Sequence, residues 1–112
     1  MYVVIFRASM RKALSEESMN EYTAVATQMR ALAMQKYACL DFVSMTENDQ
    51  ELAVSYWLDE ASILAWRKDP QHQQAQAQGK LEWYDDYRVE VLSLERRYDS
   101  NKASSEHLGG SE

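Results

Sequence analysis

The fold is decided by residues 55–98, which read SYWLDEASILAWRKDPQHQQAQAQGKLEWYDDYRVEVLSLERRY. This stretch holds all three tryptophans and four of the seven tyrosines, so most side chains able to line an apolar pocket lie here. The pattern predicts a strand, a helix broken at Asp69-Pro70 and a long final strand, because proline suits the first turn of a helix and disrupts its interior. Asp59 is expected to cap the first helical segment, and Gly79 is expected to end the second.

The residues before this stretch supply the remaining elements of an α+β fold. Residues 1–7 are β-branched or aromatic on both faces of an extended chain, which indicates a central strand. Residues 19–33 place apolar side chains at three- and four-residue spacing, as an amphipathic helix does. Either Ser15 or Ser18 is expected to cap that helix. Two further strands, joined by a polar hairpin loop, are expected at residues 40–46 and 52–57.

The resulting order, βαββαβ, is the ferredoxin-like arrangement, an antiparallel four-stranded sheet with both helices on one face. The last extended segment, residues 82–98, is longer than an ordinary strand of roughly five or six residues. We interpret the extra length as pairing with a second subunit, since an unpaired strand edge would otherwise stay exposed. Residues 1–98 are therefore predicted to be one domain of a homodimer, and residues 99–112 a disordered polar tail.

The composition disfavours several classes of partner. The chain has 12 basic and 18 acidic residues and a net charge of −6, whereas nucleic acids and anionic membranes require a basic surface. The apolar opening at residues 1–6 is too short to span a bilayer. Cys39 is the single cysteine, so we expect no intrachain disulfide and a cytoplasmic location. No metal site is expected, because one of the two histidines, His107, lies in the predicted tail.

Several strings in the sequence together resemble the antibiotic biosynthesis monooxygenase (ABM) domain family. They are VSYW at residues 54–57, ILAW at 63–66, the pattern H-x-x-A-Q-x-x-G at 72–79, and WYDDYRVEV followed by ERRY within 83–98. The resemblance covers roughly residues 1–98. It implies a dimeric α+β barrel, in which two ferredoxin-like sheets pack together, with a pocket between sheet and helices in each subunit. Members of the family include cofactor-free monooxygenases of phenolic or quinol-like aromatics and haem-degrading enzymes.

The resemblance implies a site that needs no cofactor, because an ionised phenol or quinol is electron-rich enough to react with molecular oxygen itself. The protein must then bind the aromatic substrate, take a proton and stabilise the anion. His72 suits the general base, since an unperturbed imidazole titrates near about pH 6.5. Trp66 would stack on the ring and Arg7 would face the developing oxyanion, which completes the predicted catalytic set. The predicted substrate-binding residues are Tyr56, Trp57, Phe6 and Gln76.

Other interpretations stay open. The same pocket would serve a non-catalytic ligand-binding or stress-response dimer, because fold does not fix function. Haem-degrading members resemble the chain at Trp66, but Gln76 stands where they have a haem-ligating histidine, and His72 would have to replace it. Arg7 and Ala8 stand where those members have an asparagine. For each residue a structural role competes with the catalytic one: Trp66 as core, His72 as an exposed or capping residue, and Arg7 in a surface ion pair.

Overall fold

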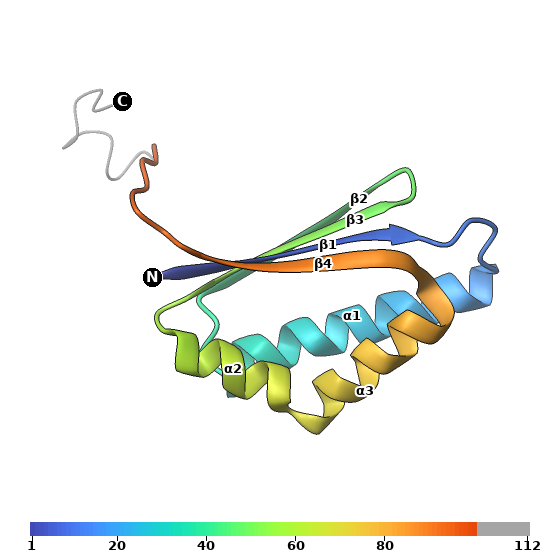
Figure 1. The fold of residues 1–112 in the computed structure, drawn as a ribbon, viewed down its shortest axis with the longest axis horizontal. Helices are drawn as coiled ribbons and strands as arrows, with labels where there is room; N and C mark the ends of the chain where they lie inside the picture. Colours follow the sequence, from blue (N-terminus) through green and yellow to red (C-terminus); the bar gives the residue numbers. More distant parts are fainter. Residues whose placement is uncertain (101–112) are drawn as a thin grey trace.

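The computed structural model describes residues 1–100, and the predicted tail lies almost entirely outside them. Within this range the chain forms one antiparallel four-stranded sheet, ordered β2-β3-β1-β4, with the helices packed on one face (Figure 1). The predicted ferredoxin-like βαββαβ fold is thereby confirmed. The elements are, in order, β1 (Tyr2–Met10), α1 (Glu16–Lys36), β2 (Asp41–Glu47), β3 (Gln50–Trp57), α2 (Glu60–Lys68), α3 (Pro70–Gln78), the π-helical turn η1 (Gly79–Trp83) and β4 (Tyr84–Ser93).

The two strand boundaries that differ most from the prediction, the end of β1 and the end of β4, both involve the pairing of β1. β1 runs to Met10 instead of ending at Arg7, because residues 8 and 9 still pair with both neighbouring strands. β4 ends at Ser93, five residues before the predicted end. Its last backbone bond to β1 joins the N–H of Leu94 to the carbonyl of Met1 (2.9 Å), and β1 offers no partner beyond that residue.

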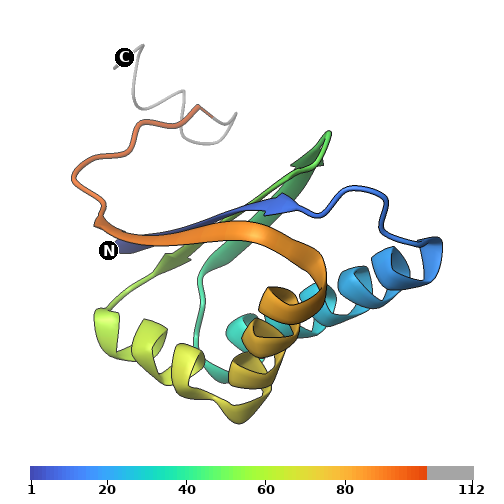
Figure 2. The same ribbon diagram turned by 45° about the vertical axis from the view of Figure 1, so that its right-hand side comes forward.

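The helix starts follow local capping signals. Ser15, and not Ser18, caps α1, since its side chain accepts from the Ser18 N–H (3.0 Å). Asp59 caps α2 as predicted, accepting from the Ser62 N–H (2.8 Å). The chain then breaks at Asp69, which accepts from the Gln71 N–H (2.8 Å) and so caps α3. The turned view in Figure 2 shows α3 continuing through η1 directly into β4.

Alternation along the strands divides the side chains between two faces. Val4 joins the core beneath the sheet and Phe6 contacts aromatic rings from the start of β4. Ile5 and Arg7 therefore point to the opposite face, which no helix within residues 1–100 covers (Figure 1). None of the helices in this range is long and apolar enough to cross a lipid bilayer.

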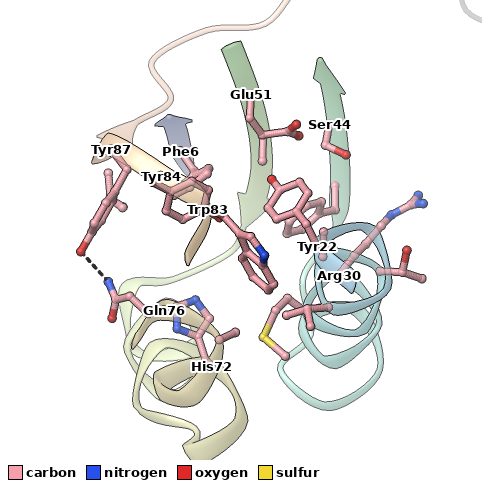
Figure 3. A pocket seen from close by; sticks show the side chains of 18 of the residues that line it. Phe6, Tyr22, Arg30, Ser44, Glu51, His72, Gln76, Trp83, Tyr84 and Tyr87 are labelled. Atoms are coloured by element: carbon pink, nitrogen blue, oxygen red, sulfur yellow. Dashed lines mark hydrogen bonds between the residues drawn. The ribbon is translucent and has the colours of Figure 1, made fainter. Parts of the chain in front are cut away.

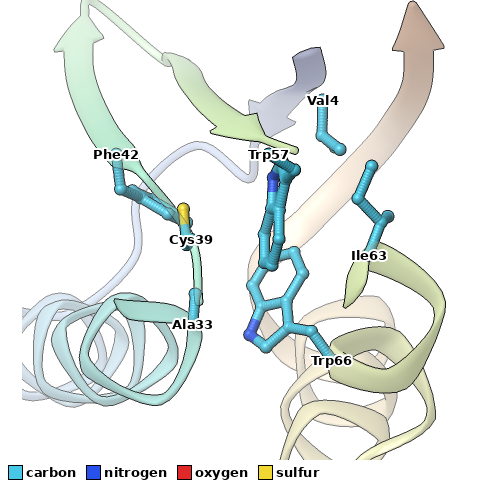
Figure 4. Close-up of a cluster of buried hydrophobic side chains, with 7 residues drawn as sticks. All are labelled: Val4, Ala33, Cys39, Phe42, Trp57, Ile63 and Trp66. Carbon is cyan, nitrogen blue, oxygen red and sulfur yellow. The ribbon is translucent and has the colours of Figure 1, made fainter. Parts of the chain in front are cut away.

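The main core lies between the sheet and the helices and is built around Trp57 (Figure 4). This side chain is 0% exposed, its indole N–H donates to the Ser55 hydroxyl (2.8 Å), and its ring lies 5.2 Å from that of Trp66. Cys39 is buried in the same cluster. The whole cluster comprises Val4, Ala33, Cys39, Phe42, Trp57, Ile63 and Trp66.

Replacing Trp57 by alanine is expected to lower the free energy of unfolding by about 3–5 kcal/mol, because it leaves a large cavity and an unpaired Ser55 hydroxyl. Leu81→Ala is the matched control: Leu81 is 74% exposed, so its truncation should change stability by no more than about 0.5 kcal/mol. Urea unfolding followed by far-UV circular dichroism measures both. Equal effects of the two variants would contradict this assignment of the core.

Candidate functional site

A cavity of about 340 Å³ lies between the sheet and the helices, within the size range of small-ligand sites (Figure 3). Its walls are mainly apolar and aromatic, with side chains from the sheet, from all the α-helices and from the end of η1. Polar and charged side chains make up the rest of the lining: Thr23, Thr27, Arg30, Ser44, Thr46, Glu51, Arg67, His72 and Gln76. The aromatic lining is Phe6, Tyr22, Phe42, Trp66, Trp83, Tyr84 and Tyr87.

The helix break at Asp69 brings Trp66 and His72 together at the cavity wall. Six residues apart on one continuous helix, the two side chains would point about 120° away from each other. Because the chain restarts as α3 in a new direction, the ring centroids lie 4.4 Å apart in an edge-to-face arrangement with an interplanar angle of 71°. Asp69 itself is buried, and accepts from the Tyr37 hydroxyl (2.5 Å) and from the Lys36 ammonium (3.3 Å) of α1.

His72 is held as a neutral imidazole. Its pKa is lowered to about 4, mainly by burial and also by the positive charge of Arg67, and the carboxylate of Asp69 opposes the change only in part. Its Nδ1 atom is buried and has no hydrogen-bond partner among residues 1–100. A neutral imidazole with a free nitrogen can accept a proton from, or donate one to, a ligand in the cavity.

Two indole N–H groups of the lining are also unpaired. Nε1 of Trp66 and Nε1 of Trp83 are buried without a partner in the described part of the chain. Buried polar groups without hydrogen bonds are rare in folded proteins, and each one calls for an explanation. Together with Nδ1 of His72 they make three unpaired nitrogens on residues that line one cavity, where a bound molecule with polar atoms can pair with them.

The carboxylate of Glu51, on β3, is another polar group of the lining. The side chain is 7% exposed, and it accepts from the Thr46 hydroxyl (2.5 Å). Burial raises the pKa of the carboxyl, an effect that hydrogen bonds from Thr46 and Tyr22 partly oppose. Figure 3 shows the Tyr22 hydroxyl directed toward Glu51. Burial also raises the pKa of Tyr22, and that of Tyr84 to about 12, so both phenols stay protonated at neutral pH.

Sequence reasoning missed Glu51, although a signal for it was present. Strand residues two apart share a face, and Glu51 lies two residues before Ala53 and six before the buried Trp57. An acidic residue on the inward face of a strand is unusual unless it is paired. Its position therefore indicated a functional group rather than a surface one.

The turn η1 positions the aromatic residues at one end of the cavity. The α-helix ends at Gly79 as predicted, but Gly79 is in the right-handed helical conformation and the chain continues as a π-helical turn. The glycine is required here because a Cβ atom would collide with the ring of Tyr84. Arg11 holds the turn from outside, donating to the carbonyls of Lys80 (3.1 Å) and Tyr84 (3.3 Å). Such π-turns often occur at functional sites.

The structure brings four of the seven predicted site residues to the cavity: Phe6, Trp66, His72 and Gln76. Gln76 donates to the Tyr87 hydroxyl (3.3 Å) at the cavity wall (Figure 3). His72 is therefore neither a capping residue nor fully exposed.

The other three predicted residues do not line the cavity. Arg7 and Tyr56 point to the uncovered face of the sheet, because each follows or precedes an inward-facing neighbour on its strand. Trp57 faces the helices but is enclosed in the core. The expected placement of Arg7 opposite an oxyanion in this cavity, and of Tyr56 and Trp57 against its ligand, is thus corrected. Among residues 1–100, no three His, Cys, Asp or Glu side chains lie close enough to hold a metal ion.

Comparison with known proteins begins with one clear relative. YqjZ of Bacillus subtilis (strain 168), a protein described as uncharacterized, is 32% identical over 97 residues, which make up 86% of this chain and 81% of that protein. The chain belongs to the YqjZ family. No family model matches it.

Solved structures extend the comparison from the YqjZ family to the fold. A crystal structure of an antibiotic biosynthesis monooxygenase superposes with a TM-score of 0.71 at 12% identity, over 86% of this chain and all of the other. SnoaB, a cofactor-independent oxygenase from Streptomyces nogalater, gives 0.71 at 10% identity over 88% and 97% of the two chains. A dimeric ferredoxin-like protein of unknown function from Thermobifida fusca gives 0.67 at 12%, over 84% and 92%. The ABM-type fold that the sequence suggested is confirmed.

The neutral state of His72 has a measurable consequence for stability. A folded-state pKa of about 4, below the usual 6.5, means that the unfolded chain binds the proton more tightly. The contribution of the neutral His72 to the free energy of unfolding is therefore fully present above about pH 6.5. It decreases as the pH drops toward 4, by up to about 2 kcal/mol between pH 7.5 and pH 5.

The check is urea unfolding of wild type and His72→Gln at both pH values. The variant should lack this part of the pH dependence. The raised pKa of Glu51 acts in the opposite direction, but it is present in both proteins and cancels in the difference. The same pH dependence in both proteins would show that His72 is not buried as a neutral group.

Proposed function

We propose that this protein is a cofactor-independent monooxygenase that oxidises a small phenolic or quinol-like aromatic in the cavity, with molecular oxygen as the second substrate. The observation that carries the proposal is the half-buried, neutral imidazole of His72, whose buried Nδ1 is unpaired and whose ring lies edge-on to Trp66 in a mainly apolar cavity. The oxygenase SnoaB, which shares the fold, supports it. The acidic composition and lone thiol make the cytoplasm the expected location.

The reaction requires the protein to bind the aromatic ring, to accept a proton and to stabilise the anion. Aromatic walls bind the ring, and the His72 imidazole accepts the proton of the substrate hydroxyl as the anion forms. The unpaired indole N–H groups of Trp66 and Trp83 are donors for the negative charge that spreads to an oxygen atom. With no cofactor present in the proposed reaction, the substrate supplies all four electrons that reduce molecular oxygen. One oxygen atom is inserted at a ring carbon as a carbonyl, and the other leaves as water with the two hydrogens lost from the substrate, one from the hydroxyl and one from that ring carbon.

The low pKa of His72 determines when the imidazole can hold the proton. Burial disfavours the imidazolium by itself, so the proton is held only while the substrate anion lies beside it. In an apolar cavity the attraction between imidazolium and phenolate is much stronger than in water. Proton transfer is thus coupled to the presence of an ionisable substrate, and without a substrate the His72 imidazole stays neutral.

Oxygen consumption tests the proposed activity. Wild type should consume oxygen above the autoxidation rate with at least one member of a panel of quinols and hydroxylated aromatics. His72→Gln should lower the rate at least about 100-fold, the usual scale for loss of a general base. Trp66→Phe should lower it less, because an aromatic ring, although smaller, stays in the lining while the indole N–H is lost.

Leu81→Ala, on the exposed surface, is the control and should retain full activity. A protein that binds an aromatic probe in the cavity but consumes no oxygen with any compound would instead be a ligand-binding member of the fold. Full activity in both site variants would remove His72 and Trp66 from the mechanism.

The second part of the proposal is a homodimer formed through the uncovered face of the sheet. Apolar side chains run across that face from strand to strand, since Ile5 pairs with Val54 and Val54 pairs with Val43. Met45, two residues further along β2, is 58% exposed. The dimeric ferredoxin-like protein from Thermobifida fusca has the same fold. Covering this face with a second copy would remove the exposed apolar surface from water.

Sedimentation equilibrium at micromolar concentration should give twice the 13.0 kDa mass of one chain. Met45→Asp places a charge in the proposed interface and should shift the protein toward monomer, whereas Leu81→Asp, on the exposed surface of η1, should not. A wild-type protein that sediments as a single chain would rule out the dimer.

A further inference from the structure

The carboxylate of Glu51 has no evident structural need for its charge. Burying a carboxylate without a cation is costly, and Glu51 takes part in none of the ion pairs formed within residues 1–100. Its two neighbours, Thr46 and Tyr22, are neutral donors. An ionised carboxylate has about four lone-pair positions, so two donors leave acceptor capacity free. The side chain lines the cavity.

Glu51 and His72 approach the cavity from different walls. Glu51 projects from β3 beside Tyr22 of α1, whereas His72 enters from α3 (Figure 3). Aromatic rings, including that of Trp83, make up the lining between them. A flat ligand in contact with those rings would thus meet one hydrogen-bond acceptor at each of two separate edges.

We propose that Glu51 is a second anchoring acceptor and that it selects aromatic ligands with two hydroxyl groups on different sides of the ring. One hydroxyl bonds the His72 imidazole, where the proton is taken, and the other donates to Glu51. The inference rests on the proposed function for the aromatic nature of the ligand, and adds the substrate class. Tyr22 and Tyr84 are positioning residues, since they surround the carboxylate and keep water from it.

A hydroxyl fits this site better than the other group that a carboxylate could bind, an ammonium. Two positively charged side chains, Arg30 and Arg67, also line the cavity, and both would repel a cationic ligand. The remaining lining is neutral or aromatic. A second hydroxyl can also satisfy the carboxylate without bringing a charge into the apolar space.

Binding of three matched ligands tests the inference without catalysis. Hydroquinone, its monomethyl ether 4-methoxyphenol, and 4-aminophenol are titrated under anaerobic conditions, with quenching of the fluorescence of Trp66 and Trp83 as readout. Wild type should bind hydroquinone at least about tenfold more tightly than the methyl ether, the scale of a hydrogen bond to a charged group. Equal affinities of the wild-type protein for hydroquinone and for the methyl ether would overturn the proposal. This comparison needs no variant.

Glu51→Gln then separates an anchoring role from a structural one. The variant keeps the shape of the side chain, and it should reduce the preference for hydroquinone to about twofold or less while leaving affinity for the methyl ether nearly unchanged. A loss of affinity for both ligands by the same factor would mean that Glu51 only supports the fold, and would overturn the proposal. Tighter binding of 4-aminophenol in its cationic form than of hydroquinone would overturn it in favour of an amine site.

The two proposals fail in different ways. If the protein consumes no oxygen but shows the Glu51-dependent preference for two hydroxyls, the proposed monooxygenase activity is wrong and the anchoring role of Glu51 is supported. If oxygen is consumed with monohydroxylated compounds as fast as with dihydroxylated ones, and Glu51→Gln does not change that ratio, the anchor is wrong and the activity stands. Leu81→Ala serves as the control in both measurements.

Discussion

The position of α3, and with it the site, depends on the buried carboxylate of Asp69. Its oxygens accept from the first turn of α3 and from Tyr37 and Lys36 at the end of α1, so a single side chain fixes the angle between three helices. The hydrogen bond from Tyr37 is the main reason why the pKa of Asp69 lies below its usual value. Loss of this contact would let α3 turn away from α2. The edge-to-face pair of Trp66 and His72 exists only because that angle is held.

The unpaired polar groups of the site destabilise the folded state, and the packing of the core offsets this destabilisation. Each buried polar group left without a partner destabilises a folded protein by roughly 1–3 kcal/mol. Three such nitrogens and the buried Glu51 carboxylate surround one cavity. Directly beside them lies the tightly packed cluster around Trp57, which has its own hydrogen bond satisfied. Trp66 belongs to both groups, since it packs in the core and its unpaired indole lines the cavity. Unpaired polar groups beside a cavity are typical of proteins that bind ligands.

The sequence predicts the fold well because its signals are local. Alternation marks the strands, and the Asp-Pro pair marks the helix break. The same alternation argues against joining Arg7 to Phe6 in one site, since neighbours on a strand point to opposite faces. Gly79 reads as a helix end in sequence, and its real role arises from packing against Tyr84, a contact that no local pattern records. The strand periodicity indicates that Glu51 faces inward, but its partner Tyr22 comes from α1, far away in the sequence, and no local pattern predicts that contact.

The way α3 is attached has a consequence for how a ligand reaches the cavity. None of the residues 70–78 belongs to the buried core, so the helix is secured chiefly at its two ends. One end is fixed by Asp69 and the other by the close approach of Gly79 to Tyr84. Because none of the residues of α3 belongs to the buried core, moving α3 disturbs less of that core than moving α1 or a strand would. α3 is thus the element whose displacement gives the least costly route of entry and exit.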